Sequence, residues 1–219
     1  MLVWQNDCTH NPQPCGFTLY PAGSANPASL AIDVSSKAAI IKGAAFDALK
    51  KAYERYPVEV KEGRANSGDN RANVIDGVYQ PSSQRDATIG ACGASAPGTI
   101  SHDSDIYYRA TMEQAQRALK LNLQTVQDLQ GTLTSNSLFK TIGTGIGNNA
   151  AHELAHQFLS NLRHMDDDSV NTYNGGSCMG DSAPWNYGLE TISWEDATAK
   201  ALESRLGAGW HILPWDLNQ

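Results

Sequence analysis

The sequence predicts a single α+β domain over residues 1–219. Two segments, 35–56 and 111–133, space their apolar residues three to four apart, which is typical of amphipathic helices. Between them lie four short stretches with the composition of β-strands, 57–61, 72–79, 87–93 and 104–110. The 219 residues contain no repeat, low-complexity tract or linker, so we expect one domain with an irregular segment over residues 1–30.

The first helix and the first strand are marked by their boundaries. Helix 35–56 follows the N-cap candidates Ser35 and Ser36 and ends before Pro57. Residues 57–61 then alternate between apolar and polar side chains, which predicts a half-buried strand closed by Gly63.

Three more helices are expected downstream. The 111–133 helix carries one apolar stripe, formed by Met112, Ala115, Leu119, Leu123, Val126 and Leu129. The glycine-rich piece 142–147 lacks the ending of a phosphate loop and the spacing of a dinucleotide site. We therefore interpret it as the lead-in to a helix at about 148–159. The last helix, 193–206, ends at Gly207.

Charge and hydropathy exclude two classes of partner. The chain has 16 Lys and Arg against 23 Asp and Glu, a formal charge of -7, and no basic run, so we expect no nucleic-acid partner. Its most apolar stretch, 38–46, is interrupted by Lys42 and is far shorter than the roughly 20 residues of a spanning helix. We therefore expect no membrane insertion.

The cysteines favour an oxidising compartment. Their number is even and no two form a Cys-x-x-Cys pair, so we expect disulfides in a secreted or extracytoplasmic protein, with buried free thiols as the alternative. Three pairings are open among Cys8, Cys15, Cys92 and Cys178. The first 16 residues lack the basic and apolar regions of a secretory signal, so we expect none in this chain.

The strongest chemical signal is His152-Glu153-Leu154-Ala155-His156 within the 148–159 helix. Two histidines four residues apart share one helical face, so both imidazoles can bind one cation, and Zn²⁺ is the expected cofactor. Glu153 lies to the side of that pair, near enough to take a proton from a zinc-activated water as general base. The alternative is a surface face of His and Glu without a metal.

A catalytic zinc keeps three protein ligands, so a third must come from another segment. His164 is the first candidate, although a continuing helix would carry it about 12 Å along the axis from His156. The chain must therefore break and fold back, and Asn161 is the residue best suited to a left-handed break. The alternative ligands are Asp166, Asp167, Asp168, Glu190 and Glu195.

These motifs resemble the metzincin clan of zinc endopeptidases. The resemblance rests on the 149–156 segment followed by His164, and on Ser177-Cys178-Met179-Gly180, and it covers most of the chain from about residue 30. It implies a twisted, mostly parallel sheet with an active-site helix and a C-terminal helix. It also implies that Met179 forms the methionine turn beneath the metal, with an ordinary core methionine as the alternative.

The resemblance also suggests where a peptide would bind. Family members hold an extended chain against an edge strand, here expected over 98–108 with Ile100, although an ordinary solvent-exposed edge is the alternative. Trp185 and Tyr187 would line the pocket beyond the scissile bond. The chain departs from the family pattern by two extra residues before His164, by Asn161 in place of glycine, and by the lack of a tyrosine two residues after Met179.

Taken together, the sequence predicts a zinc-dependent endopeptidase acting on protein or peptide substrates. One alternative is a zinc peptidase with a downstream glutamate as the third ligand. The other is a zinc-binding but inactive module that recognises extended peptides.

Overall fold

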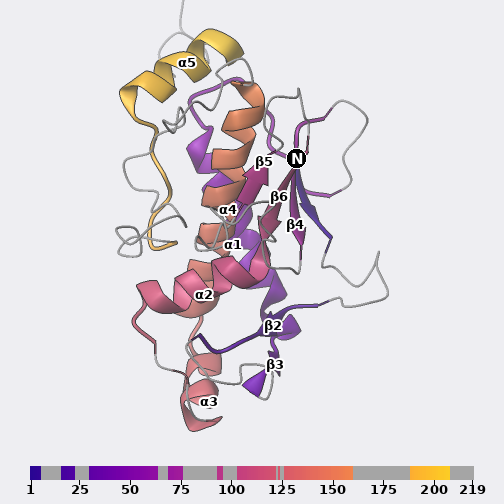
Figure 1. The fold of residues 1–219 in the computed structure, drawn as a ribbon, viewed down its shortest axis with the longest axis vertical. Helices are drawn as coiled ribbons and strands as arrows, with labels where there is room; N and C mark the ends of the chain where they lie inside the picture. Colours follow the sequence, from indigo (N-terminus) through magenta and orange to yellow (C-terminus); the bar gives the residue numbers. More distant parts are fainter. Residues whose placement is uncertain are drawn as a thin grey trace, which may run out of the picture.

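The structure is a computed structural model that describes residues 1–5, 16–22, 30–63, 69–75, 93–95, 103–121, 123, 126–159 and 188–207. In chain order the elements are β1 (Leu2–Trp4), β2 (Thr18–Leu19), β3 (Ile32–Asp33), the short 3-10 helix η2 (Ser35–Lys37), α1 (Ala38–Ala52), β4 (Arg71–Ile75), β5 (Gly93–Ser95), β6 (Asp103–Tyr107), α2 (Tyr108–Ala118), α3 (Val126–Thr134), α4 (Ser137–Phe158) and α5 (Asp196–Leu206). Figure 1 shows α1 and α4 side by side at the centre, with the sheet on one side of them.

The main sheet has the strand order β1-β4-β6-β5. Strands β1, β4 and β6 are parallel, and β5 pairs antiparallel with β6 at one end of the described sheet. A second, two-stranded sheet pairs β2 with β3. The mixed α/β architecture with a mostly parallel sheet agrees with the sequence prediction. Contrary to the expected irregular start, Leu2 to Trp4 form a strand that pairs with β4.

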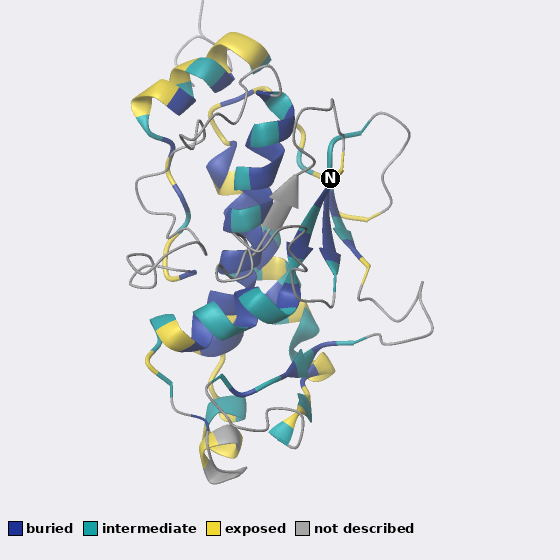
Figure 2. Ribbon diagram, viewed as in Figure 1, coloured by how far each residue is buried: buried dark blue, intermediate teal, exposed yellow. Residues whose placement is uncertain are grey.

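One face of the sheet packs against the helices, and the residues that point to it are buried. These residues are Leu2, Trp4, Ala72, Val74, Ser104 and Ile106. On α4, the Gln157 side chain donates to Ser104 Oγ at 2.6 Å and to the Arg71 carbonyl at 2.8 Å, which fixes the end of the helix on β4 and β6. Figure 2 shows the buried residues concentrated where α1, α4 and the sheet meet.

Helices α1 and α4 approach each other through glycine. A Cβ at Gly143 would lie 2.3 Å from the Ile41 carbonyl oxygen, and one at Gly147 would lie 2.3 Å from the Ala45 carbonyl oxygen. The prediction that 142–147 only leads into a helix is therefore wrong, because this piece lies inside α4, which begins at Ser137. Glycine is tolerated there because the contact it permits compensates for its poor helix propensity.

The predicted 111–133 helix is two helices. Helix α2 begins at Tyr108, directly after β6, and the chain leaves it at Lys120, whose φ of 54° is left-handed. Leu123 follows this turn and is still buried. The helical spacing of apolar residues therefore continues past the break, and the spacing alone does not show that the helix ends there. Helix α3 resumes at Val126.

Two other expectations concern the predicted strand at 57–61, which is met in part, and the end of the last helix, which is confirmed. Exposure alternates over residues 57–61 as expected, but the backbone pairs with β1 only near its end, through a parallel bridge from Glu62 to Leu2. Helix α5 stops at Gly207, whose φ is 87°, as the sequence predicts.

One buried amide, Gln116, is among the α2 side chains that hold the segment at 16–22. Gln116 Nε2 donates to the Tyr20 carbonyl at 2.9 Å, and the Ala22 N–H donates to Gln116 Oε1 at 2.9 Å. The Gln116 side chain is fully buried, and its two bonds reach half-buried backbone of the 16–22 segment.

The other face of the sheet carries Asp105, which leads to a prediction about pH. Burial raises the pKa of this carboxyl, a hydrogen bond from Asn73 opposes the rise, and the charge of Asp103 adds to it. Because the pKa of Asp105 is raised in the native state, this carboxyl stabilises the fold at pH values below its ordinary pKa of 3.8. That contribution to stability is lost as the pH rises through the native pKa. We expect Asp105→Asn to raise the Tm by about 2 °C at neutral pH.

The same substitution should leave the Tm unchanged at a pH below the ordinary carboxyl value, where the native and the unfolded aspartate are both neutral. Thermal unfolding at the two pH values measures the difference. A lower Tm of Asp105→Asn at neutral pH would show that the ionised carboxylate is stabilised and would contradict this account.

Candidate metal centre

The two motif histidines lie together on α4. The Nε2 atoms of His152 and His156 are 2.9 Å apart, and the two rings are nearly perpendicular at 84° with centroids 4.5 Å apart. Two Zn–N bonds of ordinary length at the tetrahedral angle place their nitrogens about 3.3 Å apart. The pair therefore needs to open by only about 0.4 Å to bind one zinc ion.

Glu153 follows the first histidine and is buried, with 8% of its surface exposed. Its neighbours Leu154 and Ala155 are buried as well, so this turn of α4 lies in the core on one side and presents the histidines, which are partly exposed, on the other. The arrangement provides two nitrogen donors for a metal, and the residue directly after the first donor is a carboxylate, a set of groups that suits the hydrolysis of a polar bond.

The side of α4 opposite the histidines is held by an aromatic cluster. The Tyr53 hydroxyl donates to the Ala151 carbonyl at 2.7 Å, one residue before His152. The Tyr53 ring also meets Phe158 edge-on and lies beside Trp194. The Trp194 indole N–H donates to the Ala52 carbonyl at 2.8 Å, so α1, α4 and the chain before α5 form one packed unit.

The chain returns to α4 at residues 188–192, which we call the docked segment. The Asn148 amide donates to the Glu190 carbonyl at 2.8 Å and accepts from the Ile192 N–H at 3.1 Å. Gly188 has a φ of 66°, and a Cβ there would lie 2.2 Å from the Thr141 carbonyl oxygen. The sequence analysis missed Asn148. The available signal was its position four residues before His152 in the same helix.

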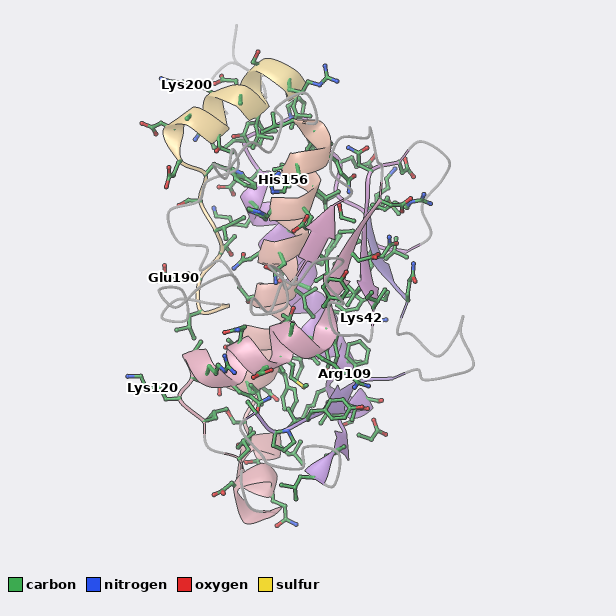
Figure 3. The ribbon with its side chains drawn as sticks, viewed as in Figure 1. Lys42, Arg109, Lys120, His156, Glu190 and Lys200 are labelled. Atoms are coloured by element: carbon green, nitrogen blue, oxygen red, sulfur yellow. The ribbon has the colours of Figure 1, made fainter. Side chains whose placement is uncertain are left out.

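The described residues do not supply a third ligand. No group of three or more His, Cys, Asp and Glu side chains placed to hold a metal occurs in the described part of the chain. The Glu190 side chain is exposed, and Figure 3 shows it well apart from His156. Glu195 precedes α5, where its carbonyl accepts from Ala199 N–H.

Other predicted site residues lie outside the described residues. They are His164, Asp166, Asp167, Asp168, Met179, Ile100, Trp185 and Tyr187, together with Cys8, Cys15, Cys92 and Cys178.

The predicted edge strand over 98–108 is wrong for its described part. Strand β6 pairs on one side with β4 and on the other with β5, so it lies inside the sheet. Strand β5 is the last strand on that side of the described sheet, and it contacts α4. The spacing of apolar residues could not show which of the two strands lies at the edge, because both strands are short. The strand predicted over 87–93 also ended at Gly93, where β5 begins.

Comparisons of the chain with models of protein families, with curated proteins and with solved structures found no match. Among the described residues, no helix combines the length and the apolar character needed to cross a membrane.

Proposed function

We propose that this protein is a zinc-dependent hydrolase. The observation that carries the proposal is the pair of Nε2 atoms from His152 and His156, 2.9 Å apart on one face of α4. They fit the coordination of one zinc ion with little movement, and the buried Glu153 lies next to them in the chain. When bound, zinc polarises a carbonyl and lowers the pKa of a water molecule towards neutrality.

The more specific proposal is an endopeptidase of the metzincin type. Three features support it: a mostly parallel sheet, an antiparallel strand β5 at its end, and a C-terminal helix after the docked segment. In the described sheet, β5 is the outermost strand on its side, so an extended peptide could add to its outer edge by main-chain hydrogen bonds and would then lie beside α4. Protein or peptide chains are therefore the proposed substrates.

Glu153 is the proposed general base. Its carboxylate would take a proton from the attacking water and deliver it to the leaving amine. Burial suits this task, because a carboxylate shielded from solvent exchanges its proton with the reacting groups rather than with bulk water.

His164 is the proposed third ligand, and its distance along the chain permits this role. It follows Leu159, the last described residue of this region, by five positions, which an extended chain covers in at most about 17 Å. His156 precedes Leu159 by three positions, or about 4.5 Å along the helix axis. The chain therefore has ample length to fold back to the two histidines.

The test is the zinc content of the purified protein, measured together with casein hydrolysis. We expect one zinc per chain and hydrolysis in the parent, and loss of both in His152→Ala and in His164→Ala. Zinc kept by His164→Ala would move the third ligand to Asp166–168, Glu190 or Glu195. Zinc binding without hydrolysis in the parent would favour an inactive peptide-recognition module. A parent protein that binds no zinc even after zinc is added would overturn the proposal.

A further inference from the structure

Asn148 binds the docked segment through main-chain groups alone. Its amide pairs with the carbonyl of Glu190 and with the N–H of Ile192, which are two positions apart as in a strand ladder. The Asn148 side chain is buried, so its bond from the Ile192 N–H is shielded from competing water, and its bond to the Glu190 carbonyl is partly shielded. Leaving a buried main-chain group without its partner is costly, which makes the docking specific for one register.

The same residue shares a helical face with the metal-binding pair. Positions four and eight apart lie on one side of a helix, so Asn148, His152 and His156 form one stripe along α4. The docked segment therefore crosses α4 one turn before the first histidine. Its second anchor is Gly188, which contacts the Thr141 carbonyl two turns further back along the same face.

We propose that Asn148 is a positioning residue that holds the docked segment on α4 one turn before His152, where the segment forms a fixed side of the substrate-binding cleft. This role rests on the proposed function. Asn148 does not touch the reacting atoms, so its contribution is to substrate binding and not to the chemical step.

The chain offers a matched control. Gln116 is also a buried amide on a helix, and it also pairs with the carbonyl and the N–H of residues two apart, Tyr20 and Ala22. It holds the 16–22 segment on α2, which carries none of the residues assigned to the metal centre. Truncating Asn148 removes two hydrogen bonds, and truncating Gln116 removes these two kinds of bond and a third, to the Met112 carbonyl at 3.3 Å. Gln116→Ala should therefore lose at least as much stability as Asn148→Ala.

The experiment compares Asn148→Ala with Gln116→Ala in the full chain. It measures Tm, zinc content, and kcat and KM on a quenched-fluorescence peptide. We expect both variants to keep one zinc per chain, and Gln116→Ala to lose at least as much Tm as Asn148→Ala. Asn148→Ala should raise KM about tenfold with kcat within about twofold of the parent, because only the wall of the cleft has moved. Gln116→Ala should leave kcat and KM unchanged.

A second variant protects the test if Asn148→Ala does not fold. Gly188→Ala places a Cβ against the Thr141 carbonyl and should displace the other end of the docked segment, raising KM in the same way. If the parent is active and Asn148→Ala and Gly188→Ala both have the same KM as Gln116→Ala, the positioning role is wrong and the proposed function still stands. A parent that binds no zinc or cleaves no peptide would overturn the proposed function, and the role with it.

Discussion

Glu153→Gln is expected to abolish most hydrolysis while leaving the zinc in place. The substitution preserves the size of a buried side chain and removes its charge and its basicity. If Glu153 takes the proton from the attacking water, kcat should fall about a thousandfold, which lies within the range for loss of a general base. The two histidines are unchanged, so the zinc content should stay at the parent value.

The matched controls are Glu190→Gln and Glu195→Gln. Glu190 is exposed and Glu195 half-buried, and neither side chain is grouped with the histidines in the described structure. Both variants should keep zinc and kcat. If Glu153→Gln retains the parent kcat, Glu153 is not the base. If it loses zinc, Glu153 acts as a ligand, and loss of zinc in either control would identify the third ligand instead.

Gly147→Ala is expected to destabilise the fold strongly, although alanine is the better helix former. The new Cβ would lie 2.3 Å from the Ala45 carbonyl oxygen and 2.8 Å from the Ala48 Cβ. Main-chain oxygen cannot rotate away, so α1 and α4 must separate along their contact. We expect the free energy of unfolding to fall by about 3 kcal/mol, as for an overpacked core.

Gly43→Ala is the control for helix propensity. Gly43 lies on α1, and no neighbouring atom lies within 4 Å of the position its Cβ would take. The same substitution there should raise the free energy of unfolding by roughly 0.5–1 kcal/mol. Urea unfolding of the two variants and the parent measures both changes. Equal effects at the two glycines would mean that α1 and α4 are not in the close contact described above.

The features that the sequence predicted best depend on local spacing. The pairing of His152 with His156 follows from four residues of helix, and the end of α5 follows from Gly207. Helix α1 ends at Ala52, earlier than the end that Pro57 predicts. The break after α2 could not be predicted in this way. Lys120 is an ordinary helix former, and the apolar residues on either side of it keep their helical spacing.

The features that the sequence missed depend on contacts between distant segments. The glycines at 142–147 suggested only a lead-in to a helix beginning at about 148, because their value within α4 comes from the backbone of α1 packed against them. Asn148 carried no recognisable motif, since its two bonds reach residues more than forty positions away. Strand β1 was missed because three residues give too short a pattern, and pairing with β4 determines their conformation.

The way in which the docked segment is attached leaves its side chains open to change. Asn148 recognises only the backbone of Glu190 and Ile192, and Gly188 is fixed by its backbone conformation. The side chains of Leu189 and Glu190 are exposed, and neither contributes a side-chain bond to this attachment. Substitutions at these two positions can therefore alter the chemistry that the docked segment presents to solvent while the geometry of its attachment stays constant. Such a surface can diversify in what it recognises without endangering the fold.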